Sequence, residues 1–377
     1  MRNNRFGVFA VLFCISAIML FVFSGNSHTL EIQQRLLCHA MGIDFENGEY
    51  SVTIQAFKPS GAGSDTPVDI TKSNIEIVSA SGKTVSEALE KCEAIKGKSV
   101  FLGHLKLICF GRSVDFSDPQ RLFEFCLKDK TVYLGVGVCL SDTTAKELMG
   151  LELTASALST ENYTSVIKKN AEKSRTVKCT LLDFFSQRSC TNSVVLPVLR
   201  ANSKGEDDGS QKKGKPPLEL TSTAVIKDGR VLDKRLLPEE SAGHCLLRKG
   251  CEEADLVLDL GSGKSSVRAS VRTRKQRITE ENGRLVYKPK LTVVVHKIKD
   301  IVTTVEPEEV ARKFTDELKR QFDKTFGEFV AGENADVFGI CKQIRCEYPG
   351  TFLENEDDIG LLLQATDARL EVECLVE

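Results

Sequence analysis

The sequence has no excess of charge of either sign. Its 51 lysines and arginines nearly balance its 53 aspartates and glutamates, which leaves a formal net charge of −2. Proteins that bind nucleic acid carry a basic surface, because they must neutralise phosphate groups. The near-neutral balance therefore argues against nucleic acid as a partner.

Sequence motifs for metal binding and catalysis are also missing. The five histidines form no His-x-x-x-His pair. His244 and Cys245 together with Cys251 could provide zinc ligands, but this is a weak indication of a zinc site. No Gly-x-Ser-x-Gly nucleophile motif occurs. The stretch GSGKSS at 261–266 suggests a phosphate loop, but the required first glycine is Leu258 and a strand pattern follows. We therefore predict a hairpin turn there, and no catalytic residue, cofactor or metal ion.

A disulfide framework is not indicated either. The 13 cysteines are odd in number, and many lie in apolar runs, as Cys109, Cys139 and Cys374 do. A free thiol in such a run behaves as a small hydrophobic side chain. One local bridge, Cys245 to Cys251 or Cys341 to Cys346, stays open, because sequence alone does not fix pairing.

The N-terminal segment has a long uncharged run. Arg2 and Arg5 precede residues 6–23, which carry no charge, and the chain then turns polar at 24–26. This pattern is typical of a secretory signal or an uncleaved signal-anchor, and its length suffices to span a bilayer. We predict a retained anchor over residues 1–25, with the N-terminus in the cytoplasm and the body outside. Cleavage before Gly25 is the alternative.

The first half of the body alternates strand and helix patterns. Residues 41–57 predict a hairpin with its turn at 46–48, because Asn-Gly strongly favours such turns. Thr84 and Glu87 form a capping box, in which each side chain accepts from the other's backbone N–H, and Gly97 supplies the helix stop. Further helices are expected after Asp118-Pro119, after Asp142 and over 161–190, and strands over 99–110, 131–140 and 192–199.

The second half opens with strands and ends with one long helix and a strand. A hairpin is expected at Asp228-Gly229, and strands over 253–260, 265–274 and 291–305. Basic residues from Lys264 to Arg277 alternate with apolar ones, which indicates the solvated face of a strand; an anionic lipid or acidic partner surface is the alternative. From Glu306-Pro307 onward, apolar residues recur four apart and predict an amphipathic helix.

These patterns predict an α+β fold with several domains. Residues 201–217 contain almost no apolar side chain, so we place a flexible linker there. The body then divides into 26–200 and 218–377, and the first part could hold a subdomain inserted at about 59–158. We expect mixed β-sheets packed by helices, behind the N-terminal anchor.

Three stretches of the body resemble the spore-germination GerAC, or Ger(x)C, family. AMGIDFENGEYSVTIQ at 40–55 resembles the start of the mature proteins, and 79–111 resembles their Gly-x-Thr helix followed by a histidine-bearing strand. Residues 322–352 resemble their long helix, Asp-x-Phe-Gly element and proline-containing segment. The positions that match the family motifs are Gly82, Thr84, Glu87, Ala88, His104, Asp336, Phe338, Gly339 and Pro349.

The resemblance implies a non-enzymatic C-type subunit of a nutrient germinant receptor. Such a subunit would lie at the spore inner membrane with its body on the outer side, beside integral membrane A-type and B-type subunits. The motif residues are interpreted as structural: Thr84 and Glu87 cap a helix, Gly82 and Gly339 allow tight turns, and His104 is a core histidine.

The sequence departs from the family in its mode of anchoring. Family members are usually lipoproteins with a lipobox cysteine and a nearby Trp-Asp pair. This chain has no tryptophan, and Cys14 follows Val11-Leu12-Phe13, where a lipobox requires a small residue. A single helix is therefore favoured over lipidation. The alternative functions are a tethered solute-binding or envelope assembly protein and, behind these, a secreted hydrolase. The germinant, the partner surface and direct nutrient binding stay open.

Overall fold

A computed structural model describes most of the chain outside its N-terminal segment. The described residues are 34–58, 74–151, 159–202, 218–260, 263–296 and 305–377, together with Phe13, Ile15 and Ser16. Within this part, no helix is long and apolar enough to cross a membrane. The anchor predicted over residues 1–25 and most of the linker predicted over 201–217 lie outside the described residues.

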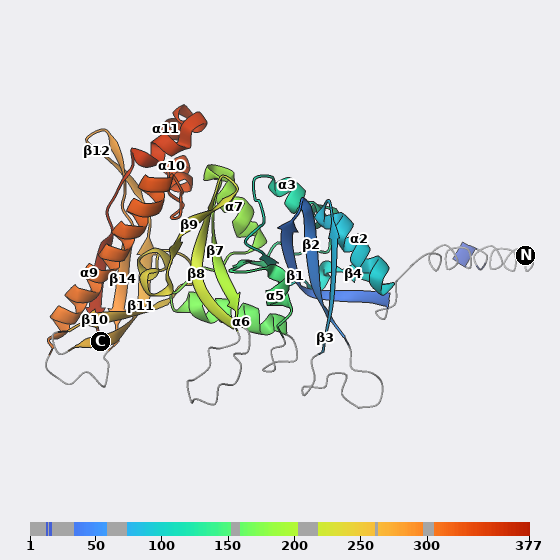
Figure 1. The fold of residues 1–377 in the computed structure, drawn as a ribbon. Coiled ribbons are helices and arrows are strands. Elements are labelled where there is room, and N and C mark those ends of the chain that lie inside the picture. Colours follow the sequence, from blue (N-terminus) through green and yellow to red (C-terminus); the bar gives the residue numbers. More distant parts are fainter. Residues whose placement is uncertain are drawn as a thin grey trace, which may run out of the picture.

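A nine-stranded mixed sheet forms the larger layer (Figure 1). The chain order of its strands is β1 (Arg35–Glu46), β2 (Glu49–Phe57), β3 (Ile75–Gly82), β4 (Ser99–Phe101), β5 (Leu107–Phe110), β6 (Gly137–Ser141), β7 (Ser193–Ala201), β8 (Leu218–Lys227) and β9 (Arg230–Leu236). In space they run β3-β2-β1-β5-β6-β7-β8-β9, and β4 also pairs with β1. The hairpin turns expected at Asn47-Gly48 and Asp228-Gly229 are present, and all four residues have positive φ.

Helices cover both faces of this sheet. One buried cluster contains side chains of α2 (Val85–Lys96), α3 (Pro119–Leu122), α4 (Glu124–Lys128) and α7 (Leu181–Thr191). On the other face, α5 (Ala145–Met149) and α6 (Ser159–Glu172) pack through Met149, Tyr163 and Ile167. The alternation of buried strands and helices thus yields a layered core.

The rest of the chain builds two smaller sheets. The four-stranded sheet orders β10 (Glu253–Asp259), β11 (Lys264–Lys275), β14 (Lys290–Val295) and β16 (Glu371–Val376). The three-stranded sheet contains β12 (Ile278–Glu281), β13 (Arg284–Tyr287) and β15 (Asp367–Ala368). The short elements between β9 and β10 are η3 (Pro238–Glu240) and α8 (Ala242–Cys245).

The long helix α9 (Pro307–Thr325) begins at the predicted proline and buries Phe314, Leu318 and Phe322 in the second core (Figure 1). It continues as the π-helical segment η4 (Phe326–Ala331). The chain then forms α10 (Ile340–Glu347), α11 (Pro349–Glu354), η5 (Glu356–Asp358) and α12 (Ile359–Gln364).

The α+β class with mixed sheets packed by helices is confirmed. Some expected strands are shorter than predicted: β6 begins only at Gly137, and β14 ends at Val295, before residues 297–304, which lie outside the described part. The stretch GSGKSS leads from β10 into antiparallel β11 with Asp259 opposite Lys264, so a strand and not a helix follows it.

The domain division predicted at 201–217 falls between two neighbouring strands of one sheet. Strand β7 pairs with β8 from Ser193 opposite Lys227 to Ala201 opposite Leu218. The nine-stranded sheet therefore includes residues from both sides of the predicted linker. The division into domains, including the subdomain at about 59–158, stays a prediction.

Candidate functional site

The first group of motif residues surrounds the start of α2. Thr84 is the N-cap, and its Oγ1 accepts from the backbone N–H of Glu87 at 3.1 Å. The Glu87 carboxylate accepts from the N–H of Lys83 at 2.8 Å, where the sequence predicted the N–H of Thr84. A Cβ on Gly82 would lie 2.8 Å from the Ala88 nitrogen, so glycine allows the helix to start this close to β3. The motif residues of this group therefore stabilise the start of α2 and its position next to β3.

His104 lies at the surface, and its interpretation as a core histidine is wrong. The apolar run 99–110 is not one strand: the short 3₁₀ turn η2 (Leu102–His104) separates β4 from β5 and turns the imidazole outward. There it stacks on His39 at 5.9 Å between ring centroids. Burial, followed by the charges of Lys106 and His104, lowers the pKa of His39.

The second group, Asp336 to Gly339, lies in the segment between η4 and α10. Both carboxylate oxygens of buried Asp336 accept backbone N–H groups of α10, from Ile340 and Cys341, at 2.8 Å each. Burial raises the pKa of Asp336, and these N–H donors oppose the rise. The backbone N–H of Asp336 donates to Ser193 Oγ at the start of β7, at 3.2 Å. This segment therefore ties α10 to the nine-stranded sheet.

The last two motif positions, Gly339 and Pro349, lie at the starts of α10 and α11. Gly339 has a φ of 79°, a backbone conformation that residues with a side chain rarely adopt. Pro349, the remaining motif position, is the first residue of α11, where its missing N–H has no consequence.

Phe338 packs in an aromatic cluster with a buried histidine. Its ring centroid lies 4.9 Å from that of Phe322 and 5.3 Å from that of His244. The His244 Nε2 lies 2.9 Å from the carbonyl oxygen of Val337. Because a carbonyl oxygen can only accept, Nε2 is the protonated ring nitrogen and donates a hydrogen bond to this oxygen. Burial, and then the charge of Arg248, lowers the pKa of His244 to about 3. Among the described residues, the fully buried histidine is therefore His244, which the sequence indicated only as part of a possible zinc site.

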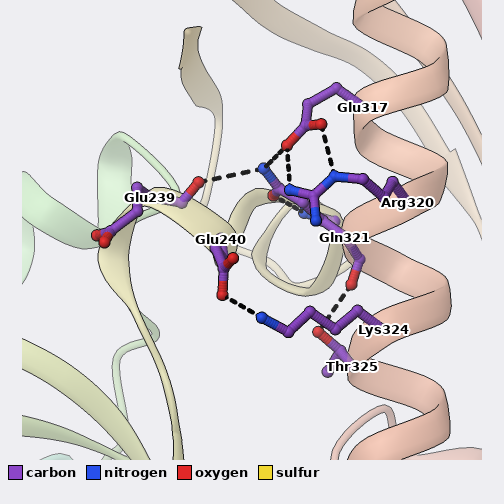
Figure 2. Close-up of polar contacts among 8 residues, drawn as sticks. Glu239, Glu240, Glu317, Arg320, Gln321, Lys324 and Thr325 are labelled. Atoms are coloured by element: carbon purple, nitrogen blue, oxygen red, sulfur yellow. Dashed lines mark hydrogen bonds and ion pairs between the residues drawn. The ribbon is translucent and has the colours of Figure 1, made fainter.

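The short helix α8 that carries His244 is held against α9 by polar contacts, which Figure 2 shows. Gln321 accepts from the Gly243 N–H at 3.2 Å and donates to the Glu239 carbonyl at 3.1 Å. Lys324 pairs with Glu240 at 2.6 Å. A Cβ on Gly243 would lie 2.6 Å from the Phe322 nitrogen, so the two helices meet backbone to backbone. This contact fixes the position of the chain that follows α8.

A pocket of about 550 Å³ lies beside the Asp336–Gly339 segment. It is bounded by α7 with the residues before it, by the segment after α8, and by the start of α10. Its charged lining residues are Lys178, Asp183, Arg248, Lys249, Asp336 and Lys342. Among the sequence-predicted site residues, the pocket collects Asp336, Phe338 and Gly339, whereas the α2 group and His104 lie elsewhere.

The pocket contains thiols but no arrangement typical of catalysis. Cys190 and Cys251 line it, and each described cysteine is free. A hydrogen bond with Cys245 lowers the pKa of Cys251, against the opposing effect of burial. Across the described residues, no cluster of three or more histidine, cysteine, aspartate or glutamate side chains could hold a metal ion.

The sequence did not single out the cationic residues of this pocket. Arg248, Lys178, Lys249 and Lys342 come from three segments that only the fold brings together. The sequence feature that came nearest to indicating the pocket was the Asp-x-Phe-Gly stretch, which forms part of the pocket wall.

Comparisons with known proteins identify related sequences and a related fold. Residues 28–201 match the family model described as "Spore germination protein N-terminal domain", and residues 221–374 match that described as "Spore germination B3/GerAC like, C-terminal". A solved structure titled "Crystal Structure of the GerBC protein" aligns with a TM-score of 0.54 at 12% identity, over 89% of this chain and 96% of that chain. No curated protein matches the chain.

Proposed function

The chain belongs to the GerAC family of spore germination proteins, and from this premise we propose that it is the non-catalytic C-type subunit of a nutrient germinant receptor. The observation that carries the proposal is the match of both family models, in order, across nearly the whole body. The fold shared with the GerBC structure supports it. Neither family model indicates an enzyme family.

An assembly or signalling role agrees with what the motif residues do. Thr84 and Asp336 each cap a helix. Gly82 permits a close approach between β3 and α2, and Gly339 adopts a left-handed backbone conformation. None of these roles presents a reactive group to a substrate. The motif residues thus stabilise the local backbone conformation. A stable surface shape is what a subunit requires to contact its partners.

We further propose a tethered position for this subunit. Residues 1–25 act as a signal-anchor in the spore inner membrane, with the N-terminus in the cytoplasm and the body on the outer side. The basic flank of Arg2 and Arg5 before an uncharged run supports this orientation. The partners are the integral membrane A-type and B-type receptor subunits, which share that membrane.

The experiment that tests the function compares two germination triggers. Spores that lack this gene are exposed to a nutrient mixture or to a surfactant, and released dipicolinic acid is measured. We expect loss of the nutrient response with the surfactant response intact, and restoration by the intact gene. Retention of the response to every nutrient in a broad panel, in spores without another C-type gene, contradicts the proposal.

The tether is tested separately with a variant of the gene. Replacing residues 1–25 by a cleavable secretory signal keeps export but removes the anchor. We expect the body to leave the membrane fraction and the nutrient response to be lost. A full response from a released body contradicts the proposed anchoring and leaves the receptor role standing.

A further inference from the structure

The charges in the pocket beside Asp336 are not balanced within the molecule. Both carboxylates have protein donors: Asp183 accepts from the Thr180 N–H and hydroxyl, and Asp336 accepts from α10. The lysines differ. Lys178, Lys249 and Lys342 are exposed and form no ion pair with any carboxylate in the described part of the chain. The pocket therefore presents cationic groups that lack an anion.

Arg248 places a fixed cation deeper in the same pocket. Its guanidinium donates to the Val337 carbonyl and, at 3.4 Å, to the Gln187 side chain. A guanidinium has five N–H donors in a planar fork, and within the described ranges its Nε–H has no acceptor. The fork matches a planar carboxylate better than a single ammonium does. The hydrogen bonds that this guanidinium donates, and the one that the Arg274 guanidinium donates to the Arg248 carbonyl oxygen, hold Arg248 in place before any ligand arrives.

The uncharged part of the pocket wall is mixed: Thr180, Ser186, Gln187 and Gln276 are polar, and the other side chains there are apolar or thiols. Val177, Leu247 and Phe338 are buried residues that line the pocket. At about 550 Å³, the space falls within the range of roughly 300–1,000 Å³ that is usual for small-molecule sites. Because apolar side chains line the same pocket as these cations, an anion with an apolar part is favoured over inorganic phosphate.

We propose that this pocket binds a small organic carboxylate. Its carboxylate lies among Arg248, Lys249 and Lys342, and its apolar body packs against Leu247 and Phe338. This site stands independently of the receptor role, because it rests on the geometry of the purified chain. Under that role, it gives the C-type subunit a ligand of its own.

The test uses matched charged and neutral probes. The full-length chain in detergent is titrated calorimetrically with benzoate and with hexanoate at constant ionic strength. Benzamide and hexanamide, which have the same shape without the charge, serve as controls. We expect saturable binding of at least one carboxylate and at least tenfold weaker binding of its amide. If neither carboxylate binds saturably, or if the amides bind equally, the proposal is wrong.

Surface variants locate the site. The double variant Lys249→Met/Lys342→Met removes exposed side chains, so folding should persist, which thermal melting without ligand checks. We expect carboxylate affinity to fall about tenfold, as two partly screened ion pairs would give. Lys319→Met, an exposed lysine on α9 outside the pocket lining, should bind as the parent does. An equal loss in Lys319→Met, or no loss in the double variant, overturns the assignment to this pocket.

Discussion

His244 on α8 is fully buried against Val337 and Phe338, in the segment that leads into α10, and it is neutral in the folded protein. Its pKa, lowered from 6.5 to about 3, reflects burial first and the facing Arg248 charge second. The unfolded chain takes up a proton as pH falls through 6.5, whereas the folded chain resists until about 3. Folding is therefore stabilised by neutral His244 above pH 6.5 and loses that stabilisation as the pH drops.

We predict that the free energy of unfolding falls by about 2 kcal/mol between pH 7.5 and pH 5 because of His244 alone. Urea unfolding at a series of pH values measures it. His244→Gln keeps a donor for the Val337 carbonyl but does not titrate, so its stability should depend less on pH. Parallel curves for parent and variant would show that His244 contributes nothing to the pH dependence.

Asp336 is the second residue whose burial has an energetic consequence. It satisfies two N–H groups at the start of α10, which no other carboxylate reaches within the described residues. Asp336→Ala leaves both donors buried and unpaired, so we expect a loss of about 2–3 kcal/mol of stability. Chemical denaturation measures the loss, with exposed Asp323→Ala on α9 as the control. Equal stability of the two variants would contradict the capping role.

At the scale of elements, the contact between α8 and α9 depends on one glycine. An added methyl at Gly243 would meet backbone atoms, the Phe322 nitrogen at 2.6 Å and the Leu318 oxygen at 2.8 Å, neither of which can rotate away. We therefore predict that Gly243→Ala lowers the free energy of unfolding by about 1–3 kcal/mol, the usual range for overpacking. Thermal or urea unfolding of the purified chain checks it.

The matched control is a glycine with free space. Gly327, in the continuation of α9, has no atom beyond its own chain neighbours and local helix backbone within 4 Å of the position that an alanine methyl group would take. Gly327→Ala should therefore be neutral or slightly stabilising. Similar losses at both positions would mean that helix geometry, and not the α8–α9 contact, explains the cost at Gly243.

Local signals in the sequence predicted the elements well where the cause is local. The Thr84 cap, the Gly97 stop and the start of α9 at Pro307 depend on groups within a few residues, and the structure has all three. The prediction of a single strand over 99–110 was wrong, because the apolar composition of this run does not show where β4 ends and the turn at His104 begins. Burial of a single residue is set by packing partners that the local pattern does not contain.

The site could be predicted only in part for the same reason. Asp-x-Phe-Gly marked Asp336 and Phe338 through the family resemblance, but not what they contact. Ser193 lies 143 positions away from Asp336, and Arg248 reaches the Val337 carbonyl across 89 positions. Such pairings depend on how the sheets and helices are assembled, so no local pattern in this one sequence reveals them.

At the scale of the whole molecule, the two family segments share structure. The C-terminal family model begins at residue 221, within β8, yet β8 and β9 belong to the nine-stranded sheet with the N-terminal strands. Asp336 also bonds to Ser193 at the start of β7. The two segments are therefore joined by a strand pairing and by the segment that forms the pocket wall.

This shared sheet predicts the behaviour of a cut chain. A protease site inserted between residues 209 and 210, in the polar stretch that the sequence marks as a linker, divides the chain between β7 and β8. Because these strands pair along their whole length, we expect the two fragments to co-elute in gel filtration after cleavage and to separate only in denaturant. The melting temperature should fall, since the cut removes the covalent link that holds the strands together. Separate elution of two folded fragments under native conditions would instead show two independent domains on a linker, and would support the predicted domain boundary at 201–217.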